Sequence, residues 1–276
     1  MSYFPTIAPG EDPLQALDQQ TAVKKLYEKE MREFEHIAKG SAGAGAALMF
    51  FALVLSNTML DYQGAEMNVE SGLMNTVSVL NTDLSKINGD INNIFQDIEN
   101  KNTGQETTDI QDFEKDTGQY YTDLNFYFNT GGSYKEGGNN EVIRQAQAPF
   151  KNENFVNAID GDFNTFQVTD GSITESLFAA IANPNTNWSN IDSSLTTFFN
   201  NAYSSSTGSS SGSTSMKQID DVVSNAETQQ NQINSTASTN LSADQQNFNS
   251  YEGTMKNILS MITSFISYAN NKTVTQ

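Results

Sequence analysis

The sequence contains no cysteine, and it has one histidine and one tryptophan in 276 residues. Without cysteine the chain cannot form disulfides, use a thiol nucleophile or build the commonest structural zinc sites. The single histidine, His36, stands beside Glu33 and Glu35 in a charged stretch, whereas metal or acid–base chemistry needs several converging partners. We therefore interpret His36 as a solvated side chain, and we expect neither enzymatic activity nor a cofactor or metal site.

Basic residues are also scarce, because 14 Lys and Arg stand against 33 Asp and Glu, for a net charge of −19. Nucleic-acid binding needs a basic face, so we expect no nucleic acid among the partners. Five of the basic residues lie within residues 1–40, which leaves nine basic against 26 acidic groups in the rest of the chain. Such an anionic body is expected to be soluble and to be repelled by anionic membranes.

The first residues, MSYFPTIAPGEDPLQALDQQ, lack the basic and apolar regions of a cleaved secretory signal. If the protein is exported, we expect a route that does not read such a signal. Pro5, Pro9 and Pro13 predict a flexible leader, and the spacing of apolar residues from Leu14 to Ala38 is roughly helical. Residues 1–40 are thus predicted to be a leader followed by a helical arm.

The most apolar run is AALMFFALVL, Ala46–Leu55. Even when counted from Ala42 it is shorter than the roughly 20 residues that a helix needs to cross a bilayer, unless the residues up to Leu60 are drawn in. Three interpretations stay open: a buried helix or subunit contact, a membrane-inserting segment, and a pilin-type anchor. Nearly 40 residues precede the run, which disfavours the anchor, since such an anchor normally begins the mature chain.

From this run onward, residues 41–101 are predicted to form the apolar segment and one long helix. Apolar residues alternate at steps of three and four between polar ones, which is the seam pattern of a coiled coil with one stutter. The seam positions are Leu55, Met59, Tyr62, Glu66, Val69, Leu73, Val77, Leu80, Leu84, Ile87, Ile91, Ile94 and Ile98.

The heptad pattern is absent from residues 102–215, where glycines separate short stretches of sequence. We predict an inserted mixed or irregular domain, in which Ile173–Ile181 has helical spacing and 204–215, made of Ser, Thr and Gly, forms a flexible linker. Asp160, Asp162 and Asn164 begin like a calcium loop, but the turn glycine and the bidentate Glu are missing, so we interpret them as an ordinary turn.

A second heptad stripe follows in residues 216–276. Its positions are Ile219, Val223, Ala226, Gln230, Ile233, Ala237, Leu241, Asp244, Phe248, Tyr251, Met255, Ile258, Ile262, Phe265 and Ala269. Two stripes of similar length, separated by a long insert, favour a mainly α fold. We predict a long antiparallel coiled-coil hairpin of N- and C-terminal helices with an inserted mixed or irregular central domain.

The hairpin brings the two most apolar stretches to the same end, which is more apolar surface than two helices can bury in each other. Subunit association is therefore expected there. Gln230 and Asp244 weaken other parts of the seam, so Phe248–Phe265 should dominate the contact. The candidate assembly residues are Leu48, Met49, Phe50, Leu53, Leu55, Met59, Phe248, Tyr251, Met255, Ile258, Ile262 and Phe265.

Three stretches carry a resemblance to a known family: AALMF at Ala46–Phe50, AEMN at Ala65–Asn68, and NSYEGTMKNILSMITSFIS at Asn249–Ser267. With the layout described above, they resemble the EspA/SseB-like extracellular filament subunits of type III secretion systems. The resemblance implies paired terminal helices around a variable region, export without a cleaved signal, and polymerisation into a hollow sheath. It implies no catalytic residues.

The expected function is an exported structural subunit that self-assembles through its terminal helices into an extracellular filament or tip of a secretion apparatus. Expected partners are further copies of the chain, an export chaperone, and needle or translocator proteins, at the cell surface or outside the cell. The alternative is a secreted translocator or effector that inserts Ala42–Leu60 into a host membrane.

Overall fold

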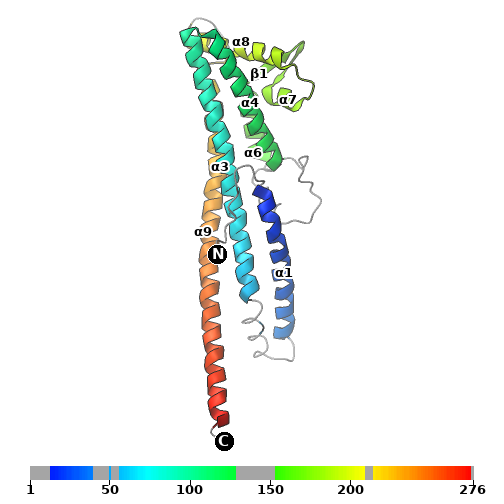
Figure 1. Cartoon of the computed structure of the whole chain (residues 1–276), viewed down its shortest axis with the longest axis vertical. Coiled ribbons are helices and arrows are strands. Elements are labelled where there is room, and N and C mark those ends of the chain that lie inside the picture. Colours follow the sequence, from blue (N-terminus) through cyan, green and yellow to red (C-terminus); the bar gives the residue numbers. More distant parts are fainter. Residues whose placement is uncertain (1–12, 40–49, 51–55, 129–152, 209–213, 275–276) are drawn as a thin grey trace. The chain divides into compact units, whose positions relative to one another are not determined.

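The computed structural model describes residues 13–39, 50, 56–128, 153–208 and 214–274, and this part of the chain is mostly helical (Figure 1). The expected mainly α class is thereby confirmed. In chain order the elements are α1 (Pro13–Lys39), α3 (Ser56–Asn100), α4 (Thr103–Phe128), α6 (Glu153–Phe163), β1 (Gln167–Asp170), β2 (Ile173–Ser176), α7 (Leu177–Ala182), α8 (Trp188–Ser206) and α9 (Met216–Val274).

The chain divides into two compact units. Unit 1 consists of residues 1–75, 140–146 and 235–276, and unit 2 of residues 76–139 and 147–234. The boundaries fall within α3 and α9, so each of these two helices contributes residues to both units. The other described helices and both strands belong to one unit each, with α1 in unit 1 and the remainder in unit 2.

Helix α3 is 45 residues long and closely matches the stretch Leu55–Ile98 that its seam pattern predicts. Within unit 2 the apolar seam is buried from Val77 to Ile94, and Ile98 near the end of the helix is half-buried. The residues with no exposed surface are Leu80, Leu84, Ile87, Ile91 and Ile94. Asn, Ser and Lys occupy many of the positions between them, so the narrow apolar stripe alone turns this helix toward the core.

The chain reverses direction between α3 and α4 within a very short turn. Lys101 has a left-handed backbone with φ of 57°, and its N–H donates to the carbonyl of Ile98 while the N–H of Asn102 donates to that of Asp97. This pair of hydrogen bonds is a Schellman motif. Asn102 directly precedes α4, and its carbonyl accepts from the N–H groups of Gln105 and Glu106 in the first turn of that helix.

The central region corrects the expectation of irregular structure in residues 102–215. Its described part contains the long helices α4 and α8 together with the antiparallel hairpin of β1 and β2. The helix expected over Ile173–Ile181 is wrong in its first half. Residues Ile173–Ser176 form β2, and the Ser176 hydroxyl then caps α7 by accepting from the N–H of Ala179 at 3.3 Å.

The predicted linker over 204–215 is also shorter than expected, because α8 continues to Ser206 and α9 begins at Met216. Residues 209–213 lie outside the described part. The β-hairpin turn consists of Gly171 and Ser172, and Gly171 has a φ of +65°. A positive φ at this position is what the tight hairpin turns of types I′ and II′ require, and glycine adopts it without strain.

Aromatic side chains form the centre of unit 2. The ring of Phe113 on α4 contacts Phe166, with ring centroids 5.1 Å apart, and Phe199 on α8 in an edge-on arrangement at 5.3 Å. Farther along α4, Tyr120 packs against Phe163, which stacks on Phe178 at 4.5 Å. These interactions join α4, α6, α7 and α8 into one core, since aromatic pairs add to the stability that area burial provides.

Helices α3 and α9 are connected by side-chain hydrogen bonds in both units. In unit 2, Asn81 Nδ2 donates to Asn231 Oδ1 at 3.1 Å, and in unit 1, Asn240 Nδ2 donates to Glu70 Oε1 at 3.1 Å. Gln230, a polar seam position, is fully buried and donates to the hydroxyl of Tyr120 on α4 at 2.5 Å.

Hydroxyl groups along α9 bond to the backbone of their own helix. Each donates to the carbonyl oxygen four residues earlier, at 2.8–3.0 Å. The donors are Thr228, Thr239, Ser242, Ser250, Thr254, Thr263 and Ser264. This long helix can therefore be rich in Ser and Thr without leaving those hydroxyls unsatisfied.

In unit 1, α1 carries the exposed His36 and many exposed charged side chains. Tyr27 of α1 stacks on Tyr62 of α3, with ring centroids 4.3 Å apart and an interplanar angle of 11°. The helix predicted over Leu14–Ala38 is present as α1. It contacts Tyr62, a seam position of α3, through Tyr27.

Candidate functional site

The residues predicted to form the assembly interface lie in unit 1, and the structure describes part of them. Leu48, Met49, Leu53 and Leu55 are outside the described residues, and so is the side chain of Phe265. Phe50 is described and half-buried. The proposed meeting of the apolar run 46–55 with the end of α9 therefore stays a prediction.

The described candidates on α9 are packed to different degrees. Ile258 is 9% exposed and Tyr251 is 37% exposed, while the others keep intermediate exposure. Half-buried are Met59 on α3 and Phe248, Met255 and Ile262 on α9. The stretch Phe248–Ile262 thus packs one side against the rest of unit 1 and leaves other apolar area exposed.

Two apolar residues that the seam pattern omits are also exposed. Leu259 is 40% exposed and Met261 is 57% exposed. They stand between seam positions Ile258 and Ile262, so a search restricted to the heptad stripe passes over them. Their signal was the local density of apolar residues in NILSMITSFIS, which is greater than a single coiled-coil seam can use.

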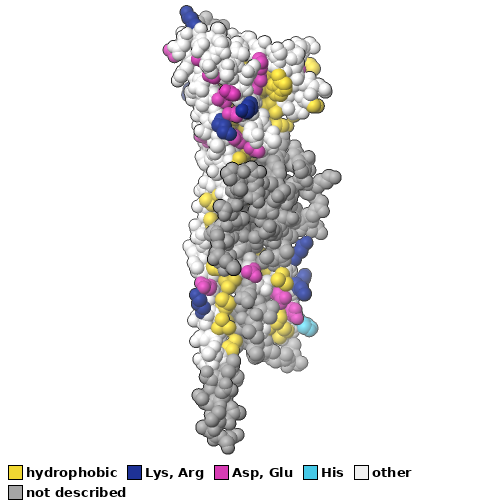
Figure 2. Space-filling view, viewed as in Figure 1, with side chains coloured by type: hydrophobic (Ala, Val, Ile, Leu, Met, Phe, Trp, Pro, Cys, Tyr) yellow, Lys and Arg dark blue, Asp and Glu magenta, His cyan; other side chains and the backbone are white. Residues whose placement is uncertain are grey.

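The charged side chains nearest to these residues along α9 form an ion pair. Figure 2 shows hydrophobic side chains in a line along the described part of unit 1, with charged side chains beside it. Lys256 on α9 pairs with Glu252 of the same helix at 2.7 Å, which offsets both charges. An apolar strip with neutralised charges is suited to contact another apolar helix.

Acidic groups mark the neighbouring part of unit 1. Asp244, a polar seam position of α9, has its pKa raised by burial and by the nearby Glu66 of α3. Burial also raises the pKa of Glu70, whose hydrogen bond from Asn240 acts in the opposite direction. The polar seam residues Glu66 and Asp244 therefore face each other, and this part of the α3–α9 contact is electrostatically weaker than an apolar seam.

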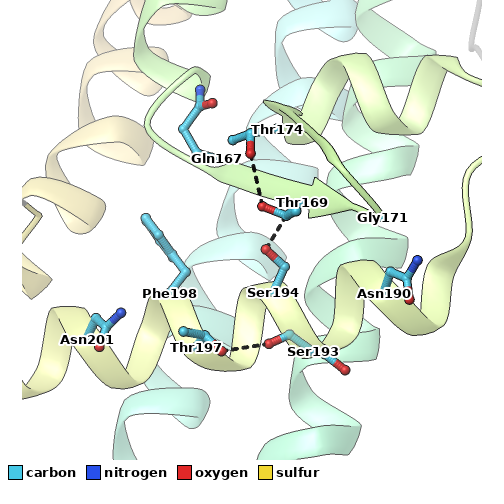
Figure 3. A pocket seen from close by; sticks show the side chains of 10 residues that line it. All are labelled: Gln167, Thr169, Gly171, Thr174, Asn190, Ser193, Ser194, Thr197, Phe198 and Asn201. Atoms are coloured by element: carbon cyan, nitrogen blue, oxygen red, sulfur yellow. Dashed lines mark hydrogen bonds between the residues drawn. The ribbon is translucent and has the colours of Figure 1, made fainter.

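Unit 2 contains an open pocket of about 560 Å³ between the β-hairpin and α8 (Figure 3). Its lining consists of hydroxyl and amide side chains together with Phe198. Several of these groups already bond to the protein: Ser194 Oγ accepts from the N–H of Thr169 at 2.9 Å, and the hydroxyls of Thr169 and Thr174 are 3.2 Å apart. The lining consists of uncharged residues, and none of its hydroxyl groups is paired with a basic side chain of the lining.

The acidic turn at the end of α6 has the local geometry of a helix end. The N–H of Asn164 donates to the carbonyl of Asp160, and that of Thr165 to the carbonyl of Asp162. In the described part of the chain, no three His, Cys, Asp or Glu side chains gather closely enough to hold a metal ion. Among the same residues, no helix is long and apolar enough to span a bilayer.

No protein-family model, no curated protein and no solved structure matches this chain. The resemblance to filament subunits therefore rests on the residue patterns quoted above. Any function must be argued from the exposed apolar surface of α9, the packing of unit 2 and the distribution of charge.

Proposed function

We propose that this protein is a structural subunit that associates with copies of itself through its long helices. The assembly would be an extracellular filament, or the tip of a secretion apparatus, as the resemblance to EspA/SseB-like subunits suggests. Contacts with an export chaperone and with needle or translocator proteins belong to the same proposal. No chemical step is part of it.

The observation that carries the proposal is that the heptad seam of α9 is buried in unit 2 but partly exposed in unit 1. The seam residues of α9 are buried at Ile219, Val223 and Ala226 in unit 2, but are half-buried or exposed over most of Phe248–Ile262 in unit 1. Leu259 and Met261 add apolar area beside the seam. Apolar area that a chain leaves uncovered over several turns of a helix is typical of an interaction surface.

The finer fold that we propose is an antiparallel coiled-coil hairpin of α3 and α9. Its support is the order of the contacts along the chain: Asn81 bonds to Asn231 in unit 2, and the earlier Glu70 bonds to the later Asn240 in unit 1. Residue numbers fall along one helix as they rise along the other, as antiparallel pairing requires. Copies of the hairpin would then associate through Phe248–Ile262.

The charge of the chain favours association through this surface over other contacts. With a net charge of −19, two copies repel each other at most approaches. The apolar strip of α9, in which Lys256 pairs with Glu252, avoids that repulsion. Raising the salt concentration should therefore promote assembly, because it screens the repulsion and leaves the hydrophobic contact intact.

The test is to place charge on the exposed strip without disturbing the packed side of the helix. Leu259→Asp and Met261→Asp introduce carboxylates at exposed positions, whereas Ile258 is too well packed for a clean substitution. Ser260→Asp is the matched control, because it adds the same charge between them at another exposed position. Sedimentation velocity and negative-stain microscopy measure the size and form of the assemblies.

We expect the wild type and Ser260→Asp to assemble, and Leu259→Asp with Met261→Asp to stay monomeric with an unchanged circular dichroism spectrum. Assembly of the double variant to normal filaments would contradict the proposal. A liposome flotation assay tests the alternative. If wild-type protein floats with the vesicles and stays monomeric in solution, the apolar residues of unit 1 contact lipid rather than another subunit.

A further inference from the structure

Unit 2 contains carboxyl groups that face each other across helix contacts. Asp83 of α3 faces Asp123 of α4, Asp97 of α3 faces Asp109 of α4, and Glu114 of α4 is within hydrogen-bond reach of Asp192 of α8. This arrangement is unusual because two ionised carboxylates repel each other, and burial strengthens the repulsion. Figure 2 shows acidic side chains gathered in this unit, with basic side chains among them.

The pair of Glu114 and Asp192 is the clearest example. Glu114 is only 8% exposed, and neither its Oε1 nor Asp192 Oδ1 receives a hydrogen bond from any described residue. The other oxygen of Asp192 accepts from Gln111 Nε2 at 3.3 Å. Among the described residues, the charged group that acts on Glu114 is Asp192, which carries the same sign of charge. A proton between the two carboxyl groups would satisfy both oxygens at once.

Asp90 and Asp83 extend this pattern along α3. Asp90 faces Asp109, Asp112 and Asp116 of α4, with Lys115 of α4 as the opposing charge. Asp83 is 3% exposed, and Lys86 of its own helix pairs with one of its oxygens at 3.0 Å. The second oxygen of Asp83 has no donor among the described residues.

We propose that these carboxyl contacts bind protons as unit 2 folds, so that the packing of α3, α4 and α8 tightens under mildly acidic conditions and loosens under alkaline ones. The proposal concerns regulation by pH and does not depend on self-association. It follows from geometry, because each contact lacks either a donor or a cation that an ionised pair would require.

The pKa values of the individual carboxyl groups are all raised, as proton binding on folding requires. Burial, followed by the contact with Asp192, raises the pKa of Glu114 from its ordinary value of 4.5 to about 9. Burial and the carboxylates of α4 raise the pKa of Asp90 to about 7, and burial and Asp123 raise that of Asp83 to about 6. Each group thus keeps its proton in the folded state at a pH where the unfolded chain has released it.

The sign of the pH effect follows from this difference. Between the ordinary and the raised pKa, the folded state binds more protons than the unfolded state, so the free energy of unfolding decreases as pH rises. The destabilisation is complete above the raised pKa and absent below the ordinary one. For Glu114 the window extends from about pH 4.5 to about pH 9, and for Asp83 it ends near pH 6.

The experiment is urea unfolding of the full chain at constant ionic strength, from about pH 5 to about pH 9, since each carboxyl that retains its proton only when folded changes the unfolding equilibrium by up to about tenfold per pH unit. The fluorescence of the only tryptophan, Trp188 on α8, reports on unit 2. We expect the unfolding constant of the wild type to rise steadily across this range.

Glu114→Gln removes the proton uptake and supplies an amide donor to Asp192. It should lower the unfolding constant at alkaline pH by at least tenfold and flatten the slope, with little effect near pH 5. Glu99→Gln is the control, because it removes the same charge from an exposed position of α3 and should keep the wild-type slope. If Glu114→Gln does not fold, Asp192→Asn relieves the same pair from α8.

Two results would overturn the proposal. Equal slopes in the wild type, Glu114→Gln and Glu99→Gln would show that the pH dependence comes from the net charge of the chain. Stabilisation of the wild type by millimolar calcium at alkaline pH, lost in Glu114→Gln, would show that the pair holds a cation instead of a proton.

Discussion

The same heptad seam is packed differently in the two units. In unit 2, the seam residues of α3 from Leu80 to Ile94 have no exposed surface, because α4 and the aromatic core that it shares with α6, α7 and α8 add to the burial. In unit 1, Leu73 of α3 is buried, whereas Met59 and Tyr62 remain half-buried. A repeating sequence pattern thus specifies a helix and its inner face, while the number of neighbouring elements decides how much of that face is covered.

The largest expected effect on stability comes from replacing one seam isoleucine by alanine in each unit. Ile91→Ala removes a fully buried side chain of α3 and should lower the free energy of unfolding by about 2–5 kcal/mol. Ile262→Ala removes a half-buried side chain of α9 and should cost about half as much or less, since less area leaves water on folding. Urea unfolding monitored by circular dichroism measures both, and equal losses would contradict the proposed difference in burial.

A smaller effect is expected from the polar seam position of unit 2. Tyr120→Phe leaves the buried amide of Gln230 without its acceptor and should lower the free energy of unfolding by about 1–3 kcal/mol. Adding Gln230→Leu should restore most of the loss, because both polar groups are then gone. If the double variant is as unstable as the sum of the single ones, the hydrogen bond is not what holds these residues together.

The smallest effect is local to the turn between α3 and α4. Lys101→Gly should raise the free energy of unfolding of unit 2 by about 0.5–1 kcal/mol, because glycine adopts a φ of 57° without the cost that a side chain imposes. Lys115→Gly, at an exposed interior position of α4, should instead lower it by about 1 kcal/mol. Thermal unfolding followed by Trp188 fluorescence distinguishes the two, and a loss for Lys101→Gly would contradict the strain at this residue.

The long helices were predictable because their seams extend over many turns. The seam from Leu55 to Ile98 indicated α3 almost to its ends, and the second stripe indicated α9. Local spacing was misleading for Ile173–Ser176, where strand pairing with Gln167–Asp170 determines the backbone instead. The reversal after α3 was missed because the left-handed position is occupied by Lys101 and not by glycine.

The central helices were missed for a different reason. Glycines such as Gly104 and Gly118 suggested breaks, yet both lie inside α4 with open space where a Cβ would be. Tertiary packing of Phe113 and Tyr120 compensates for the low helix propensity of glycine. The carboxyl pairs, too, were hidden from sequence reasoning, because Glu114 and Asp192 are far apart in the chain and only the fold brings them together.

The assembly residues were predicted only in part. Phe248, Met255 and Ile262 emerged from the stripe, whereas Leu259 and Met261 required solvent exposure to be known. A heptad pattern identifies the residues that face a partner helix within the chain. It says little about residues on the flank, which become available to a second molecule because they are not needed for the first contact.

The hydroxyl bonds of Ser and Thr along α9 have a mechanical consequence. Each such hydroxyl shares a carbonyl with the helix backbone, which weakens and slightly bends the helix at that turn. Because these bonds recur from Thr228 to Ser264, compliance is distributed over many turns and is not concentrated at one hinge. When α9 is bent, the curvature should therefore spread over many turns, and the helix should keep its secondary structure.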